Sequence, residues 1–214
     1  MHRRSKRPKT NIELEDREAA GLWKAISLAN RLGEEKGKIT LQIILDIHRA
    51  MFGFAYPDIA GRFRKTGEDI KKLKCMEPPP GRLIEGKMYQ FWRDLDTRLA
   101  GMQRTPKEQT RTQRKKWFAE VITIAAWIQH EITAIHPFCD GNGRMARLMT
   151  NLILKRFGLP GSRVKYEGEH KAHYLDALCQ IDQHGDFEPL QKLIARSVFE
   201  AMEKERKWRS VQGK

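Results

Sequence analysis

The amino-acid sequence predicts an all-α protein, and three stretches of helical periodicity carry this prediction. Apolar residues between Ala19 and Leu32 recur every three or four positions, which places them along one face of a helix. A largely apolar stretch, residues 121–135, is long enough to form a buried helix, and helical spacing resumes from Met145 to Phe157. Together these stretches predict a compact bundle of helices.

Capping residues and glycines set the expected ends of the first two helices. Asn11 is predicted to cap a helix that Gly33 ends, and Thr40 is predicted to cap a second helix ending at Gly53. Residues 54–83 are expected to form a loop, because three consecutive prolines followed by a glycine prevent a helix there.

The second half of the chain continues the helical pattern. A helix is expected over residues 84–99, followed by a polar linker over 101–112 and the long central helix. Two more helices, near residues 170–181 and 188–203, close the predicted domain.

The length of 214 residues fits one domain with a single core. We expect a basic tail over residues 1–12, a domain over 13–203 and a charged tail over 204–214. No apolar run reaches the ~18 residues of a membrane span. The basic N-terminus lacks the apolar segment of a secretory signal.

Three cysteines bear on the compartment. Cys75, Cys139 and Cys179 are odd in number and far apart in the sequence, so we expect neither a metal pair nor a disulfide framework. This usage favours a reducing cytoplasm, with secretion as an effector as the alternative.

The net charge of +14 is the one feature that a small enzyme domain does not explain. Basic proteins often bind nucleic acid or acidic partners. Here the basic residues are dispersed, with clusters in the expected tails and connections. Nucleic-acid binding is therefore not expected, although the charge does not exclude it, and an acidic target or inhibitor accounts for the charge equally well.

The most informative stretch runs from His136 to Arg147, with the sequence HPFCDGNGRMAR. It is a polar loop between two predicted buried helices, and it ends at a helix N-terminus. Such a terminus presents free backbone N–H groups and the positive end of the helix dipole, which suits phosphate. Arg144 and Arg147 lie three residues apart beside this positive end, where a bound polyphosphate would stabilise them.

Other residues of the same stretch suggest the rest of a phosphate site. Gly141 and Gly143 allow the close backbone approach that an anion-binding nest requires. Asp140 could hold Mg²⁺ together with substrate phosphates, and His136 could act as a general base. For each residue an ordinary structural role stays open: a turn, a cap, a salt bridge or a hydrogen-bonded histidine at a helix end.

Competing motifs fail on spacing or context. The glycines fit a dinucleotide fingerprint only formally, because a helix precedes them where a strand is required. No P-loop string occurs. His130 and His136 are six residues apart, whereas a zinc-protease helix needs histidines four apart, so we expect His130 to be a packing or surface residue.

The string His-Pro-Phe-x-Asp-Gly-Asn-Gly-Arg-x-x-Arg resembles the motif of the Fic family (filamentation induced by cyclic AMP) at every defined position. Further similarity lies in Ile47–Gly53, in Ala60–Arg64, and in Tyr174–Leu178 followed by Gly185 and Asp186. The resemblance covers roughly residues 40–200. It implies the Fic fold, a helical bundle with a short β-hairpin flap that aligns a target segment by strand pairing.

The resemblance also implies an activity, the transfer of AMP from ATP with Mg²⁺ to a Ser, Thr or Tyr hydroxyl of a target protein. The implied roles follow the motif. The base is His136, the magnesium ligand is Asp140, the loop anchor is Phe138, the phosphate loop is Gly141, Asn142 and Gly143, and the polyphosphate ligands are Arg144 and Arg147. Lys171 and Tyr174 are expected to contact the adenosine, although plain core packing is an equal alternative for Tyr174.

The candidate flap is the segment Ile70–Leu83, including Pro79 and Pro80, although it shows little strand alternation. One branch of the family carries a lysine in the motif loop and transfers phosphate, so Gly-Asn-Gly-Arg favours AMP transfer. A donor such as UTP or GTP, and a non-catalytic basic binding module, remain alternatives.

Many Fic proteins inhibit themselves through a Ser/Thr-x-x-x-Glu-Gly/Asn helix. The two Glu-Gly pairs of this chain have Gly81 and Arg163 at the first position of that string, so neither fits. Either the inhibitory helix belongs to a separate partner, as in the toxin–antitoxin branch of the family, or inhibition is absent or takes a divergent form in this chain. Of these we expect the separate helical partner.

Overall fold

The computed structural model describes residues 10–35, 37–70, 74–102, 110–164 and 168–212. Within these residues the only strand-like feature is a single bridge residue, Met76, so the all-α prediction is confirmed. The elements in chain order are α1 (Asn11–Glu34), α2 (Leu41–Phe52), the short 3-10 helix η1 (Gly81–Leu83), α3 (Ile84–Leu99), α4 (Arg111–Ile135), α5 (Asn142–Arg156), α6 (Glu169–His184) and α7 (Glu188–Val211).

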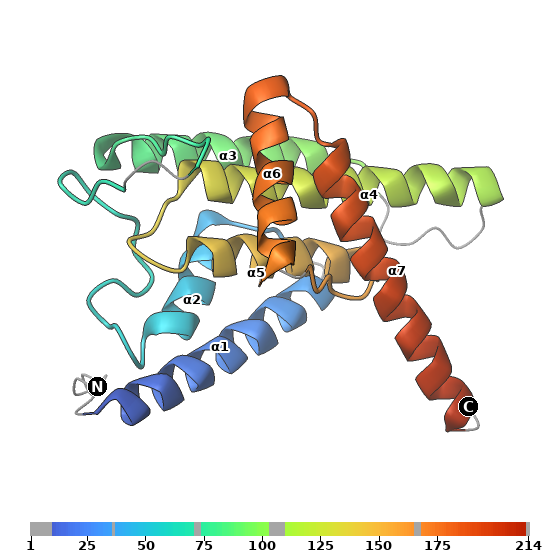
Figure 1. Cartoon of the computed structure of the whole chain (residues 1–214), viewed down its shortest axis with the longest axis horizontal. Coiled ribbons are helices and arrows are strands. Elements are labelled where there is room, and N and C mark those ends of the chain that lie inside the picture. The colour runs from blue at the N-terminus through green and yellow to red at the C-terminus, as the bar shows by residue number, and fades with distance from the viewer. Residues whose placement is uncertain (1–9, 36, 71–73, 103–109, 165–167, 213–214) are drawn as a thin grey trace.

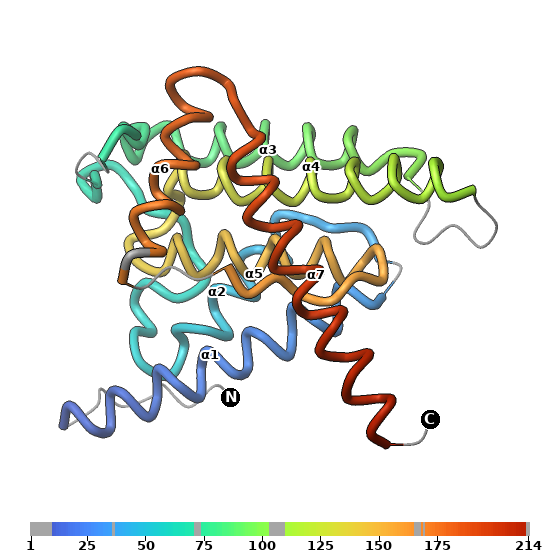
Figure 2. Tube along the Cα trace, turned by 45° about the vertical axis from the view of Figure 1, so that its right-hand side comes forward, coloured from blue at the N-terminus to red at the C-terminus, as the bar shows by residue number. Residues whose placement is uncertain are grey.

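The helices are arranged in layers around α4 and α5 (Figure 1). These two helices run antiparallel, with α3 along the outer side of α4 and with α1 and α2 against α5. Helices α6 and α7 cross the pair, and the two views agree on this arrangement (Figure 2). The loop joining α4 to α5 therefore emerges at one end of the bundle, beside α2.

The core centres on α4, which is buried on nearly all sides over its second half. A helix that is apolar all round belongs in a protein interior. Ile128 of α4 and Leu152 of α5 have no exposed surface. Each fully buried aliphatic side chain of this size contributes about 1.5–3 kcal/mol, so this pair of helices forms a rigid platform for the loop between them.

The predicted ends of α1 are wrong at both termini. Thr10, not Asn11, is the N-cap, because its hydroxyl accepts a hydrogen bond from the Glu13 amide at 3.1 Å. At the other end the helix continues through Gly33. A Cβ at Gly33 would lie 2.6 Å from the Leu152 carbonyl oxygen, so this glycine allows α1 to approach α5 closely instead of ending the helix.

Other predicted ends are confirmed. Thr40 caps α2 and Gly53 follows its last residue, while α3 spans 84–99 as expected.

The segment from residue 204, expected to be a tail, continues α7 as far as Val211, because its Lys, Arg and Glu residues are good helix formers. The expected tail over residues 1–12 and the 101–112 linker lie largely outside the described residues. None of the helices in the described part of the chain is both long and apolar enough to cross a membrane.

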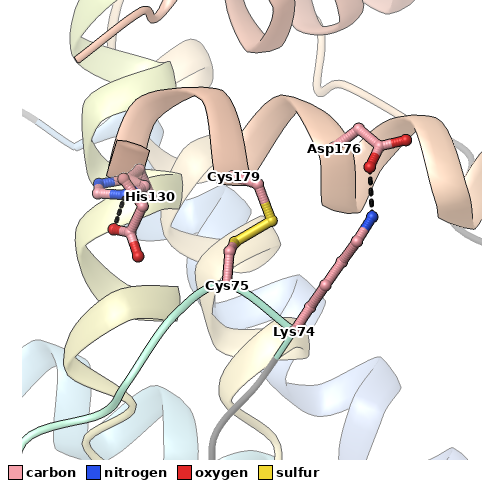
Figure 3. Close-up of a disulfide and its surroundings, with 6 residues drawn as sticks. Lys74, Cys75, His130, Asp176 and Cys179 are labelled. Carbon is pink, nitrogen blue, oxygen red and sulfur yellow. Dashed lines mark hydrogen bonds and ion pairs between the residues drawn. A yellow bond between two sulfur atoms is a disulfide. The ribbon is translucent and has the colours of Figure 1, made fainter. Parts of the chain in front are cut away.

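The prediction that the cysteines stay unpaired is wrong, because Cys75 and Cys179 form a disulfide (Figure 3). Their Cα atoms lie 5.6 Å apart although 104 residues separate them in the sequence. Beside the disulfide, Lys74 forms an ion pair with Asp176 of α6. The crossing of α6 over the bundle brings these residues together, which sequence spacing cannot show. Cys139 is free. The cysteines therefore no longer argue for a reducing compartment.

The β-hairpin flap is not visible in the described residues. Of the candidate segment, residues 71–73 lie outside the description, and the remainder is loop followed by η1. We call residues 53–80 the α2–η1 loop. The disulfide ties this loop to α6 at Cys75, and the loop passes beside the α4–α5 connection through Arg64.

Candidate active site

The connection between α4 and α5, residues 136–141, is here called the motif loop. It starts at His136, which adopts a left-handed conformation with φ 50° and ψ 59° and ends α4. Pro137 explains this exit, because a proline disfavours helical backbone at the residue before it. Left-handed backbone is uncommon outside glycine, so the surrounding contacts must hold His136 in place.

Arg64 of the α2–η1 loop supplies such contacts. Its Nε donates to the His136 carbonyl at 2.7 Å, and its Nη2 lies 3.4 Å from the Ile135 carbonyl. The Arg64 amide donates to the Pro137 carbonyl at 2.9 Å. These acceptors lie at the C-terminus of α4, where a cation is favoured by the helix dipole.

The imidazole of His136 has one nitrogen available to accept a proton. Its Nδ1 lies 3.1 Å from the Thr133 carbonyl, which can only accept, so Nδ1 carries the proton and Nε2 keeps its lone pair. Burial lowers the pKa of His136 below its ordinary value, and the hydrogen bond to Thr133 opposes this effect. The ring is therefore neutral at neutral pH, with Nε2 able to take up a proton.

Asn142 and Phe138 hold the motif loop closed. The Asn142 side chain accepts from the Phe138 amide and donates to the Phe138 carbonyl, both at 2.8 Å. The Phe138 ring is fully buried and stacks on the ring of His48 at 3.8 Å between centroids. Asn142 thus binds the loop backbone with both ends of its amide, so it fixes the shape of the motif loop.

His48 of α2 is a residue that the sequence argument missed. Its Nδ1 accepts from the Gly61 amide at 2.9 Å, so its Nε2 carries the proton and donates to the Asp140 carbonyl at 3.1 Å. Burial lowers the pKa of His48 to about 4, which keeps the ring neutral. Both His48 and Gly61 lie in segments already noted as similar to the Fic family, so a signal existed, but no physical role followed from it.

The N-terminus of α5 has the features of an anion site. Its N-cap is Gly141, which has no side chain to accept from the first-turn amides. Gly141 has φ 79°, and a Cβ there would lie 2.3 Å from the Phe52 ring, so only glycine fits. Gly143, by contrast, has room for a Cβ, with Arg147 Nη1 at 3.5 Å as its neighbour.

The two arginines of the motif lie beside this terminus. Arg144 lies over the Phe52 ring at 4.7 Å and is 3.6 Å from the Asp140 carboxylate. That ion pair is partly exposed, so it contributes little to stability and does not prevent Arg144 from binding an anion. Arg144 and Arg147 line the same cavity as the motif loop.

A magnesium ion would find one protein ligand here. The described residues contain no group of three side chains able to hold a metal ion. The Asp140 carboxylate is more than half exposed, and one of its oxygens accepts from the Gly141 amide at 2.5 Å. Mg²⁺ is commonly held by one or two carboxylates plus substrate phosphates, so a lone carboxylate beside an uncapped helix N-terminus fits this ion.

Two cavities meet at the arginines. One, of about 380 Å³, is lined by His136, the residues from Cys139 to Arg144, Arg147 and Ile70. The other, of about 620 Å³, has apolar walls from α1, α5 and the residues before α6, together with polar groups such as Asn151 and Ser162. Arg144 and Arg147 line both cavities. A ligand with a charged end and an apolar body would match this pair of cavities.

Cys139 is not a competing nucleophile in this site. Burial raises the pKa of its thiol, and the nearby Glu68 carboxylate adds to this effect. Nη1 and Nη2 of Arg62 donate to the two carboxylate oxygens of Glu68 at 2.8 and 2.7 Å, and this pairing lowers the pKa of Glu68 to about 2. A protonated thiol is a weak nucleophile, so Cys139 is not activated for attack.

The remaining predicted site residues lie in several different parts of the structure. Tyr174 is buried, and its hydroxyl accepts a hydrogen bond from the Gln129 side-chain amide at 3.1 Å. This placement agrees with the alternative that Tyr174 packs in the core. Lys171 is exposed on the first turn of α6. Of the predicted flap residues, Ile70 lines the 380 Å³ cavity beside His136, and the Pro79 carbonyl accepts a hydrogen bond from Arg64. Pro80 is the N-cap of η1 and Leu83 is its last residue. Contacts of Lys171 and Tyr174 with a nucleotide stay predictions.

A family model described as "Fic/DOC family" matches residues 38–154 of the chain. The chain belongs to the Fic/DOC family. This establishes the resemblance noted in the sequence and places the site geometry in a known family.

Two proteins illustrate the relationship in sequence and structure. "Protein adenylyltransferase Fic" of Nematostella vectensis is 33% identical over 184 residues, covering 86% of this chain and 38% of that protein. A solved fragment of Fic-1 from C. elegans superposes with a TM-score of 0.70 at 26% identity, covering 96% of this chain and 55% of that one. The chain thus spans about a third of the length of the curated relatives.

The fold extends to more distant proteins. The N-terminal Fic domain of a VirB-translocated Bep effector from Bartonella quintana, solved with bound ADP, has a TM-score of 0.60 at 18% identity. It covers 91% of this chain and 89% of that structure, and at this identity it supports the fold alone. These neighbours agree with the all-helical architecture described above.

Proposed function

We propose that this chain is a protein adenylyltransferase, which transfers AMP from ATP with Mg²⁺ to a Ser, Thr or Tyr hydroxyl of a target protein. One observation carries the proposal. A neutral histidine with a free Nε2 lines the same cavity as an uncapped helix N-terminus and two arginines. The curated relatives that bear the name protein adenylyltransferase support the same activity.

The chemistry follows from this arrangement. The target hydroxyl gives its proton to Nε2 of His136 as its oxygen forms a bond to the α-phosphorus of ATP, and pyrophosphate leaves as the bond to the bridging oxygen breaks. The α5 amides, Arg144 and Arg147 stabilise the charge that develops on the phosphates. Asp140 would hold Mg²⁺, which supplies further neutralisation of phosphate charge.

Labelled nucleotides test the proposal directly. ATP labelled at the α-phosphate should label a target protein, whereas ATP labelled at the γ-phosphate should not. Label from the γ-phosphate would instead show phosphate transfer. Label from UTP or GTP in preference to ATP would show a different donor, and no label from any nucleotide would favour a non-catalytic binding module.

Replacing Arg147 with alanine is expected to weaken the binding of ATP far more than that of ADP. The motif match places this arginine on the γ-phosphate, which ADP lacks, and a charge-assisted contact contributes roughly 1.5–3 kcal/mol. Calorimetric titration of the variant with both nucleotides measures the difference. The variant Arg163→Ala is a control: this residue lines the larger cavity and is absent from the one that His136 lines, so any loss of affinity that it causes should be equal for ATP and ADP. Equal losses for ATP and ADP would place Arg147 elsewhere on the nucleotide.

We further propose that a separate helical partner controls this site, as a small antitoxin-like inhibitor protein would. A glutamate of the partner would pair with Arg147 and displace the γ-phosphate from its productive position. The positive helix end beside Arg147 favours such an anion. The excess of basic residues also suits an acidic partner.

The chain in isolation is therefore expected to modify itself without truncation. Mass spectrometry of the purified protein incubated with ATP would measure this activity. Versions lacking residues 1–12 or the segment after Glu203 serve as comparisons, and we expect them to be no more active. A rise in activity after either cut would place an inhibitory element within this chain and refute control by a separate partner.

A further inference from the structure

Among the residues that the structure describes, Arg64 is the largest fully buried side chain, and it carries a positive charge. Burying an ion costs several kcal/mol unless its hydrogen bonds are satisfied. Arg64 meets this requirement mainly with backbone carbonyls. Its Nε and Nη2 reach His136 and Ile135 at the end of α4, and Nη2 also donates to the carbonyl of Pro79.

The acidic partner of Arg64 is too exposed to explain the burial. Asp69 lies 3.7 Å from Nη1 with its side chain 60% exposed, and Nη1 has no hydrogen-bond partner. The same Asp69 carboxylate accepts from the Gly81 amide at 2.7 Å, at the start of η1. The guanidinium is thus a junction between the end of α4 and the last residues of the α2–η1 loop.

We propose that Arg64 is a positioning residue for the AMP-transfer reaction, coupling the candidate target-docking segment around Pro79 to the backbone of His136. This inference rests on the proposed function. It differs from a purely stabilising role, because the carbonyls that Arg64 binds belong to the base and to the segment expected to hold the target. A displacement of either one is transmitted through a rigid, planar guanidinium to the other.

Nucleotide binding should depend little on this junction. The α5 N-terminus is shaped by Gly141, by the Asn142 bonds to Phe138 and by the His48 contact to Asp140, none of which involves Arg64. Loss of the junction should therefore lower the rate of transfer to the target and leave ATP affinity largely intact. A misplacement of about 1 Å at a reacting group costs about 10²-fold in rate.

The charge of Arg64 gives a second readout. A cation close to His136 disfavours the imidazolium form, so Arg64 lowers the pKa of His136. The other charged groups around this ring are Asp140, which raises the same pKa, and Arg144 and Arg147, which line the shared cavity. Removing only the charge at position 64 should therefore raise the pKa of His136.

Two substitutions separate geometry from charge. Arg64→Lys keeps the positive charge but cannot reach several carbonyls with one planar group, whereas Arg64→Met keeps the length and removes the charge. For both we expect kcat for target modification to fall by about tenfold to a hundredfold, with little change in ATP affinity. In the nucleotide-free protein, NMR titration of His136 should show a higher pKa for Arg64→Met and a nearly unchanged one for Arg64→Lys.

A matched control is Arg156→Lys, since Arg156 donates to the Gly37 carbonyl at 2.6 Å on the far end of α5. This variant should alter neither kcat nor the His136 titration. Full activity in Arg64→Lys would overturn the proposal, as would an equal loss of ATP binding and transfer. If neither variant at position 64 folds by circular dichroism, Arg64 is a stabilising residue and the proposal also falls. Absence of transfer by the wild-type chain would instead refute the proposed function.

Discussion

Replacing His136 with alanine is expected to lower the rate of AMP transfer by about 10²- to 10⁴-fold, the usual effect of removing a general base. The physical reason is the free Nε2, which the Nδ1 bond to Thr133 leaves as the proton acceptor of the loop. ATP binding should change little, because the α5 N-terminus and the two arginines remain in place. Transfer from α-labelled ATP and calorimetry with ATP measure the two quantities.

The left-handed backbone at His136 calls for a second variant. Alanine is strained at φ 50°, whereas asparagine tolerates this conformation, so His136→Asn removes the base with less disturbance of the loop. His184→Ala, at the exposed end of α6, controls for loss of a histidine elsewhere. Near wild-type transfer by both His136 variants would show that another group accepts the proton.

Local patterns predict much of this fold because helix periodicity and capping are local properties. Thr40, Gly53 and the bounds of α3 could be derived from a few neighbouring residues each. Gly33 shows where this argument fails. Its expected role as a stop depended on the sequence alone, whereas its actual role depends on the carbonyl of Leu152 in another helix.

The position of the motif loop between two helices could be predicted, since its residues are contiguous in the sequence. The side chains that hold the loop in place could not be predicted, because they come from distant parts of the chain. His48 meets Asp140 across 92 residues, and Arg64 meets His136 across 72. A lone buried histidine or arginine gives no periodic signal, and its partners are backbone atoms that the sequence does not distinguish. The same reasoning applies to Tyr174, whose helical spacing indicates burial but not the hydrogen bond from Gln129.

Removing the disulfide by the paired substitutions Cys75→Ser and Cys179→Ser is expected to lower the free energy of unfolding by about 2–4 kcal/mol. The bond closes a loop of about a hundred residues, since 104 positions separate the two cysteines, and cross-linking so long a loop restricts the unfolded chain strongly. For a protein of this size the melting temperature should fall by roughly 5–15 °C. Urea unfolding of the oxidised protein and of the double variant measures the change.

Two comparisons isolate the covalent bond from its surroundings. Asp176→Asn removes the neighbouring ion pair with Lys74, which is about half exposed and should contribute at most about 1 kcal/mol. A thiol reductant should destabilise the wild type as much as the double substitution does, and it should leave the double variant unchanged. Equal stability with and without reductant, together with free thiols at Cys75 and Cys179 in a non-reducing peptide map, would refute the bond. Forming this disulfide requires oxidation of the two thiols, so the protein must pass through a compartment where disulfides form.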